Sequence, residues 1–331
     1  MSSESGQVVA PSAPSNTVRV AVTNHEPEWL DLQAGVAKTI KLIAEAASKG
    51  AKLIAFPETW LIGYPAWIWN RPVDFALGVK YVQNSLVLDS PEMKKIQQAA
   101  ADNDIAVFLG FSERRGESVW IAQALIDRSG KLVSARRKMK ATHMERTIFG
   151  DASGDCLSEV VDIEGVGRVG GLCCWEHIQP LLKFYTFSQG EQIHVAAWPV
   201  LDPFVEGSPG FWSMSTEGIL STAQTYAVES QAFVLSATTV ISEKGIEIMS
   251  TKGTPLMGTP NKGSSAIIGP DGRILAGGVD SPNEKLVIAD LDLTQVTKCK
   301  TFADAIGHYS RPDLLWVGVD KKHKSVVVVQ D

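Results

Sequence analysis

Residues 124–133 read ALIDRSGKLV and residues 266–275 read AIIGPDGRIL, so one pattern occurs twice, 142 residues apart. Each copy has two apolar runs joined by a turn that contains glycine, which is typical of a β-hairpin. Hairpin turns recur by chance, so this match alone would carry little weight. At the same offset, however, residues 56–58 (FPE) fall onto residues 198–200 (WPV). Two matches at one offset predict an internal two-fold repeat.

Helix and strand patterns alternate along the rest of the chain. Strands are predicted at residues 18–22, 52–56, 105–111, 168–174, 193–198, 233–238 and 285–293, and strand pairs at residues 119–138 and 264–276. Helices are predicted at residues 31–48, 91–103, 180–189 and 216–231. The last strand is expected to close the regular structure. Since the halves of the repeat interrupt each other, we expect two sheets of one α/β domain.

The composition limits the classes of partner. With 331 residues, 44% of them hydrophobic, the chain can bury a substantial core. A net charge of -6 and an isoelectric point near 5.6 argue against a nucleic-acid partner, which usually requires a basic surface. No membrane span is expected, because no uncharged apolar run reaches about eighteen residues.

Residues 1–16 are rich in serine and proline and lack both an apolar core and arginine. They therefore resemble neither a signal peptide nor a transit peptide, and we predict a disordered tail. In the absence of a secretory signal, the four cysteines are expected to be free thiols in a reducing compartment, which favours a cytoplasmic protein.

Three segments carry residues suited to catalysis, each where a predicted strand ends. Cys174 lies in residues 171–177 (GLCCWEH), Glu58 follows the strand at residues 52–56, and Lys138 ends a strand. Strand ends are the usual place for chemistry in α/β chains. A thiol, a carboxylate and a lysine can act as nucleophile, base and electrostatic stabiliser.

Each of these residues also has a purely structural interpretation. A cysteine in an apolar strand is usually a core residue, and Cys173 and Cys174 point to opposite faces of a strand, so they cannot both line one pocket. Glu58 could be a solvated strand-end carboxylate. The basic run at residues 136–140 is expected to include a solvated residue, Arg136 or Lys140. The spacing of Cys174 and His177 permits zinc, but no second Cys or His pair with zinc spacing follows, so we expect no metal. No phosphate-binding loop is recognised, and no cofactor is expected.

In combination, the motifs resemble the nitrilase superfamily. They are FPE at residues 56–58, RK at residues 137–138 with Glu145 seven residues on, and CWEH at residues 174–177. The nitrilase branch is the most similar, because residues 142–151 (THMERTIFGD) and residues 307–313 (GHYSRPD) also resemble it. The resemblance spans residues 17 to 320, and it departs from the usual pattern at Ala141, where nitrilases have proline.

The resemblance implies a four-layer αββα sandwich with internal two-fold pseudo-symmetry, which agrees with the repeat. It implies that Cys174 is the nucleophile, Glu58 the base and Lys138 the group that holds negative charge on the attacked atom. Glu145 is implied to position the lysine or the hydrolytic water. Cys173, Cys156 and Cys299 are then ordinary packed thiols.

The implied reaction is hydrolysis of an organic nitrile to the carboxylic acid and ammonia through a cysteine thioimidate and an acyl-enzyme. Three alternatives remain open: a cyanide hydratase or dihydratase, an amidase or carbamoylase of the same superfamily, and a catalytically silent scaffold that forms filaments. An intact set of Glu58, Lys138 and Cys174 argues against the scaffold.

Aromatic residues near the motifs indicate the substrate. Strand-end loops usually build pockets, and aromatic walls favour flat apolar ligands, so an aromatic or arylaliphatic nitrile is expected. The candidate lining residues are Trp60, Tyr64, Trp67, Trp198, Trp175 and His177. Trp69 and Phe211 belong to the same aromatic segments. Such aromatics also often pack between layers.

The expected domain organisation is a tail at residues 1–16, a carbon–nitrogen hydrolase domain at residues 17–300, and an oligomerisation tail at residues 301–331. Residues 314–317 (LLWV) and 325–329 (SVVVV) are more apolar than a tail leaves exposed on a monomer. The family resemblance also implies a homodimer or a higher helical homo-oligomer.

Overall fold

Two six-stranded mixed sheets form the centre of the molecule. The computed structural model describes residues 16–208, 210–254 and 256–328. The strands are β1 (Thr17–Asn24), β2 (Leu53–Ala55), β3 (Ala106–Arg115), β4 (Ser118–Ile126), β5 (Leu132–Arg137), β6 (Val161–Ile163), β7 (Gly167–Cys173), β8 (Ile193–Ala197), β9 (Phe233–Ala237), β10 (Ala266–Ile268), β11 (Ile274–Gly277) and β12 (Lys285–Asp292). They are ordered β12-β1-β2-β3-β4-β5 in one sheet and β11-β10-β9-β8-β7-β6 in the other.

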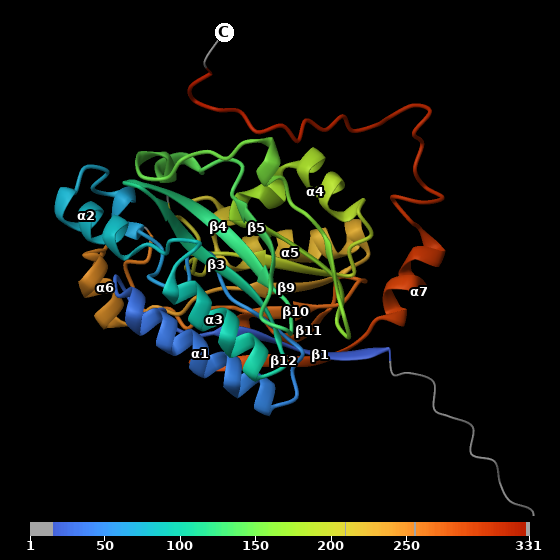
Figure 1. The fold of residues 1–331 in the computed structure, drawn as a ribbon, viewed down its shortest axis with the longest axis horizontal. Helices are drawn as coiled ribbons and strands as arrows, with labels where there is room; N and C mark the ends of the chain where they lie inside the picture. Colours follow the sequence, from blue (N-terminus) through green and yellow to red (C-terminus); the bar gives the residue numbers. More distant parts are fainter. Residues whose placement is uncertain (1–15, 209, 255, 329–331) are drawn as a thin grey trace, which may run out of the picture.

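Helices cover the outer faces of the sheets (Figure 1). The α-helices are α1 (Leu32–Ser48), α2 (Phe75–Asn84), α3 (Pro91–Asp102), α4 (Pro180–Phe187), α5 (Thr216–Ser230), α6 (Glu243–Met249) and α7 (Thr294–Phe302). The 3-10 helices are η1 (Ala66–Trp69), η2 (His143–Thr147), η3 (Gly154–Cys156), η4 (Cys174–Ile178), η5 (Trp212–Met214) and η6 (Gly278–Asp280). Helices α1 and α3 lie together beside the first sheet, and α4 and α5 contact strands of the second.

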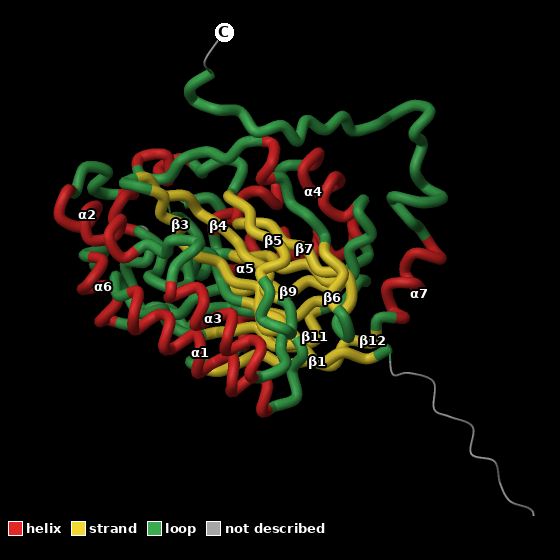
Figure 2. Tube along the Cα trace, viewed as in Figure 1, coloured by secondary structure: helices red, strands yellow, loops and turns green. Residues whose placement is uncertain are grey.

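Strand alternation explains the layers (Figure 2). In β1, Val20 and Val22 belong to the core between the sheets, whereas Ala21 belongs to the core under the helices. In β8, Val195 and Ala196 divide in the same way. Because successive side chains point to opposite faces, a strand that is apolar throughout must be covered on both sides. The predicted αββα sandwich follows and is confirmed.

The predicted two-fold repeat is present in the backbone. β4 and β5 pair antiparallel with a register shift between Leu125 and Ile126, and β10 and β11 do so with a shift between Ile267 and Ile268. The connecting turns place Gly130 at φ 83° and Gly272 at φ 85°, values that favour glycine. The same irregularity 142 residues apart shows that the repeat is structural, and that both halves of the chain build the same unit.

The structure differs from the sequence prediction after β12. That strand was expected to close the regular structure, but α7 follows it. Helix α7 buries only Val296, and α2, which was also not predicted, buries only Tyr81. The weak apolar stripe of α7 explains why its pattern did not predict it.

The chain termini lie outside the sandwich. The predicted disordered tail, residues 1–16, lies outside the described residues except for Asn16. Residues 303–328 contain no helix or strand and extend past the body of the molecule (Figure 1). Within the described ranges, no helix combines the length and apolarity needed to cross a bilayer.

Candidate active site

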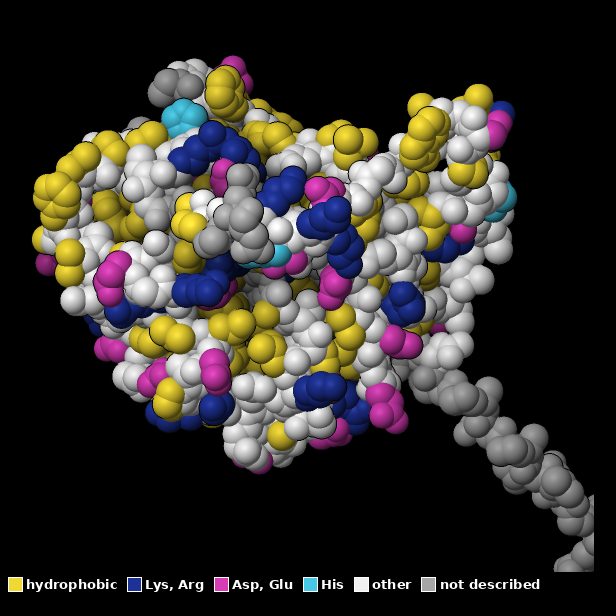
Figure 3. All heavy atoms as spheres, turned by 45° about the horizontal axis from the view of Figure 1, so that its top comes forward, with side chains coloured by type: hydrophobic (Ala, Val, Ile, Leu, Met, Phe, Trp, Pro, Cys, Tyr) yellow, Lys and Arg dark blue, Asp and Glu magenta, His cyan; other side chains and the backbone are white. Residues whose placement is uncertain are grey.

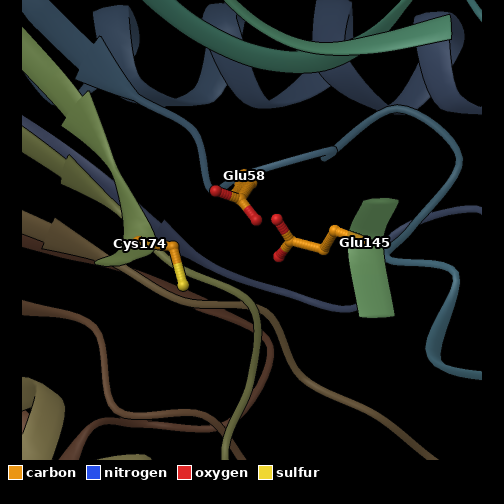
Figure 4. Close-up of side chains that lie close together, drawn as sticks. All are labelled: Glu58, Glu145 and Cys174. Atoms are coloured by element: carbon orange, nitrogen blue, oxygen red, sulfur yellow. The ribbon is translucent and has the colours of Figure 1, made fainter. Parts of the chain in front are cut away.

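The ends of β2, β5 and β7 bring the three predicted catalytic side chains together. Lys138 Nζ lies 3.3 Å from Glu58 Oε2 and 2.8 Å from Glu145 Oε2. Ligand atoms of Glu58, Glu145 and Cys174 all lie within 4.8 Å of one another. Figure 4 shows these three side chains converging from a loop, a helical turn and a strand end. One buried centre therefore combines residues that are far apart in the sequence.

Cys174 is positioned by a turn of the backbone. It is the first residue of η4, directly after β7, and its φ is 45°. Non-glycine residues seldom adopt this left-handed conformation, which is costly and concentrates at functional sites. The preceding residue, Cys173, is fully buried within the strand. The two adjacent thiols therefore occupy different environments.

Burial dominates the electrostatics of Glu58. The side chain is inaccessible to solvent, and its Oε1 has no hydrogen-bond partner among the described residues. Desolvation raises the pKa of Glu58 to about 8, against the opposing effect of Lys138. A carboxyl group with a pKa near neutrality can both take and return a proton, which suits a general base.

Lys138 and Cys174 remain in complementary protonation states. Although burial alone favours the neutral amine, Glu145 and Glu58 hold the pKa of Lys138 well above its ordinary value. Burial raises the pKa of the Cys174 thiol well above its ordinary value, while Lys138 opposes this effect. The resting site therefore pairs a neutral thiol with a permanent ammonium, and the thiol requires a base before it can attack.

Glu145 is held from several sides. Its Oε1 accepts a hydrogen bond from the Tyr64 hydroxyl at 3.0 Å, and its Oε2 accepts one from the Thr142 backbone N–H at 2.7 Å. Trp69 Nε1 in turn donates to the Tyr64 hydroxyl at 3.1 Å. These contacts fix the carboxylate that contacts Lys138, so Glu145 is placed to orient the lysine.

An apolar cavity of about 280 Å³ opens onto Cys174 and Glu145. The Trp69 and His143 rings stack against each other in its wall, with centroids 5.4 Å apart. Its lining residues are Tyr64, Trp69, Thr142, His143, Glu145, Cys174, Trp175, Pro199, Leu201, Phe211, Met214 and Leu256. Such a cavity, apolar with a few convergent polar groups, is typical of a small-molecule site.

The six candidate substrate-binding residues separate into two groups. Tyr64 and Trp175 line the cavity. The other four, which do not line it, make core contacts: Trp60 Nε1 donates to Thr39 Oγ1, Trp67 packs edge-on against Tyr81, and Trp198 stacks on His177.

Their flanking residues form the wall instead. Trp69 and Pro199 lie next to these aromatics in the sequence and line the cavity. Aromatic content therefore located the segments that contribute to the cavity wall. It could not indicate which side chains face the cavity, because that depends on how each loop turns at its strand end.

Glu176 links two of the motifs and was not among the predicted site residues. Its carboxylate pairs with Arg136 at 2.6 and 2.8 Å and accepts hydrogen bonds from the backbone N–H groups of Cys173 and Met139, both at 2.9 Å. Arg136 or Lys140 was expected to be solvated. Arg136 is buried, and Lys140 is exposed. The buried ion pair therefore fixes the segment before Cys174 against the segment around Lys138.

The three ligand-like side chains also raise the question of a metal ion. Glu58, Glu145 and Cys174 have the donor types for a divalent cation. The Lys138 ammonium, however, already contacts both carboxylates. A cation bound there would have to displace this lysine or remain close to its positive charge, so the donor set does not fit a metal.

Sequence comparisons identify the family of the chain. The family described as carbon-nitrogen hydrolase matches residues 19–301. An arylacetonitrilase from Aspergillus kawachii is 59% identical over 312 residues, which cover 93% of this chain and 94% of that protein. An arylacetonitrilase from Hypocrea virens is 55% identical over 314 residues, covering 95% of each.

A structural comparison agrees. An amidase from Nesterenkonia sp. superimposes with a TM-score of 0.63 over 88% of this chain and 96% of that one, at 19% identity, which shows a shared fold. The sequence motifs, the fold and these relatives lead to one conclusion. The chain belongs to the carbon-nitrogen hydrolase family, the nitrilase superfamily that its motifs resemble.

Proposed function

We propose that the protein is an arylacetonitrilase, an enzyme that hydrolyses an aromatic acetonitrile to the carboxylic acid and ammonia. The observation that carries this proposal is the apolar, aromatic-walled cavity that ends on the Cys174 thiol. Relatives 50–59% identical over more than nine-tenths of the chain bear the name arylacetonitrilase, which supports the same substrate class.

The first half of the reaction consumes the nitrile. Glu58 takes the thiol proton of Cys174, and the sulfur attacks the nitrile carbon, which forms a C–S bond and moves a π-electron pair onto nitrogen. The nitrogen gains a proton, giving a neutral thioimidate. The Lys138 ammonium stabilises the negative charge that develops during attack.

The second half adds two molecules of water. Glu58 takes a proton from the first water as its oxygen bonds to the thioimidate carbon, and the protonated nitrogen leaves as ammonia, which produces a thioester. A second water attacks that carbon, the C–S bond breaks, and the acid and free thiol are released. If the C–S bond breaks before ammonia leaves, the product is the amide.

The alternatives fit the site less well. A cavity of about 280 Å³ with an apolar wall is far larger than cyanide requires. The retained Glu58, Lys138, Glu145 and Cys174 contacts have no purpose in a silent scaffold. The amidases of the same fold are 18–20% identical to this chain, so they support the fold and not the substrate.

We also infer that the protein assembles with copies of itself and resides in the cytoplasm. Exposed apolar side chains gather near α2, at the left of Figure 3, where Val73, Phe75 and Val79 are 72, 82 and 55% exposed. A second copy of the chain is the proposed occupant, as the family resemblance implies. Free cysteines fit a reducing compartment.

A nitrile panel tests the substrate assignment. Phenylacetonitrile, an aliphatic nitrile of similar size, and cyanide should be compared by ammonia release, with acid and amide measured separately. Phe211→Ala should raise KM for phenylacetonitrile several-fold more than for the aliphatic nitrile, because Phe211 lines the cavity. Phe302→Ala, an exposed aromatic outside the cavity lining, is the matched control. Faster turnover of cyanide than of any organic nitrile would refute the proposal.

A further inference from the structure

A chain of three buried titratable side chains leads to the backbone of Cys174. Glu191 Oε1 lies 2.8 Å from His194 Nδ1, and His194 Nε2 lies 3.0 Å from His177 Nε2. His177 Nδ1 lies 2.7 Å from the carbonyl oxygen of Cys174. Each of the three side chains is at most 1% exposed. None of them lines the cavity or acts in the mechanism above.

The number of protons that Glu191, His194 and His177 share follows from their contacts. A neutral imidazole has one N–H and one bare nitrogen, and the Cys174 carbonyl can only accept a hydrogen bond. Two neutral histidines and a carboxylate supply two protons for three contacts. In one of the contacts, two lone pairs would therefore face each other, which is repulsive. With one more proton, every contact becomes a hydrogen bond. In that state, His177 Nδ1–H donates to the Cys174 carbonyl.

The surroundings show where the additional proton resides. Burial lowers the pKa of His177 well below its ordinary value, with His194 adding to the effect, so the His177 ring is neutral. In the state with three hydrogen bonds, His177 Nδ1–H donates to the Cys174 carbonyl and the bare His177 Nε2 accepts from His194 Nε2–H, so the third hydrogen lies in the contact between His194 Nδ1 and Glu191 Oε1. There the Tyr226 hydroxyl donates to Glu191 Oε2 at 2.7 Å, and the Tyr226 ring stacks on His194 with centroids 3.7 Å apart.

Gly170 shows that the sequence makes room for this arrangement. A side chain at this position in β7 would collide with Glu191 Oε1. The strand therefore needs glycine here for the carboxylate to reach His194. The three residues come from η4, β8 and the segment before β8, so the arrangement belongs to the second sheet and its adjoining segments.

The peptide bond links this chain to the reacting sulfur. The carbonyl of Cys174 and the N–H of Trp175 belong to one planar trans peptide, so they point in opposite directions. The Trp175 N–H is a backbone donor beside the Cys174 thiol, and it lowers the pKa of that thiol. When His177 holds the carbonyl, it therefore also fixes the direction of that N–H.

We propose that Glu191, His194 and His177 are positioning residues that share one additional proton and lock the Cys174–Trp175 peptide, with its N–H directed at the reacting sulfur. The proposal rests on the role of Cys174 as nucleophile and applies whichever nitrile is hydrolysed. The locked N–H is the second donor, after Lys138, beside the reacting sulfur.

Nitrogen-15 spectroscopy on the wild-type protein tests the proton count directly and needs no substrate. Solid-state spectra of histidine-labelled protein should show His177 with a protonated Nδ1 and a bare, hydrogen-bonded Nε2. The His177→Asn spectrum assigns these signals by their loss. A bare Nδ1 on His177 overturns the proposal, even if the enzyme hydrolyses nitriles as proposed.

Variants of Glu191 test the effect on catalysis. Glu191→Gln should keep turnover within about threefold, because its amide N–H can donate to His194 while its oxygen accepts from Tyr226. Glu191→Leu should lower kcat at least tenfold, change KM less than twofold, and slow alkylation of Cys174 by iodoacetamide. Tyr226→Phe removes a hydrogen bond to Glu191 but keeps the three contacts that lead from Glu191 to the Cys174 carbonyl. It should therefore behave like Glu191→Gln. Equal losses in Glu191→Gln and Glu191→Leu, or none in a folded Glu191→Leu protein, overturn the proposal.

Discussion

The backbone at Cys174 is left-handed, and of the two adjacent thiols only Cys174 lines the cavity. Cys173 ends β7 and is fully buried, whereas Cys174 begins η4 with φ 45°. Glu58 is followed by Thr59, which also has a positive φ, of 52°. Positive φ values therefore occur beside two of the candidate catalytic residues, where the backbone turns after a strand.

Substitution of the two thiols should separate their roles. Cys174→Ala should abolish ammonia release from any nitrile, because no other group can form the thioimidate. Cys173→Ala should keep most of the turnover and lose about 1–2 kcal/mol of the free energy of unfolding through the small cavity it leaves. Urea unfolding and an ammonia assay measure both effects. Substantial turnover by Cys174→Ala would end the nucleophile assignment.

The raised pKa of Glu58 sets the pH dependence. Burial raises the pKa of this carboxyl from an ordinary 4.5 to about 8, so it is half ionised near pH 8 and mostly protonated below it. Because the base must be ionised, kcat/KM should rise with a midpoint near pH 8 and level off only above it. Glu58→Gln should remove this rise and lower the rate by orders of magnitude. A midpoint between pH 4 and 5 would show that another group controls the rate.

At the scale of elements, Glu176 couples β5 to η4. It joins Arg136 near the end of β5 to the backbone at Cys173 and Met139. Lys138 lies between Arg136 and Met139, so the same carboxylate fixes both the lysine segment and the nucleophile segment. A single buried ion pair therefore sets the distance between two groups that must cooperate in the reaction.

Removal of the Glu176 charge should strongly lower the free energy of unfolding. Glu176→Gln leaves the Arg136 guanidinium buried without its counter-ion, which costs about 3–5 kcal/mol of unfolding free energy. Lys140→Gln breaks the exposed Lys140–Asp151 pair and should cost less than about 1 kcal/mol. Chemical denaturation measures both values. Equal, small losses would show that Arg136 finds another partner or water.

At the scale of the molecule, the two copies of the repeat share a backbone but contribute different residues to the site. The first sheet supplies Glu58 and Lys138, and the second supplies Cys174. The segment at residues 198–200, which corresponds to the Glu58 motif, has Val200 in place of the carboxylate and Pro199 in the cavity wall. The candidate catalytic centre therefore combines residues of both halves.

The C-terminal tail offers a test of assembly. It is tied to its own chain by Lys321–Glu159 and His323–Asp155, while Leu315 and Trp316 are 82 and 78% exposed. Removal of residues 307–331 should reduce the number of chains per particle measured by light scattering, because the apolar segment at residues 314–317 is lost. Lys321→Gln with His323→Gln is the control, since it loosens the tail but keeps that segment. An unchanged particle after truncation, or a monomeric full-length chain at micromolar concentration, would contradict the predicted assembly.

The sequence by itself determined the fold class and the candidate reactive groups. Strand alternation, hairpin turns and the 142-residue repeat predict two sheets in one α/β domain, and the family resemblance adds the helical layers, because these signals are patterns of residues along the chain. The order of motifs selected Glu58, Lys138, Glu145 and Cys174 for the same reason.

Only the tertiary structure decided what surrounds those groups. It placed Trp60, Trp67 and Trp198 in the core and Trp69 and Phe211 in the cavity wall, because the direction of a loop side chain depends on what packs against it. It also brought His177, His194 and Glu191 into one line, although nothing in their spacing distinguishes them from ordinary core residues. Local patterns specify strands and motifs, but contacts between strand ends arise only when the sheets close on each other.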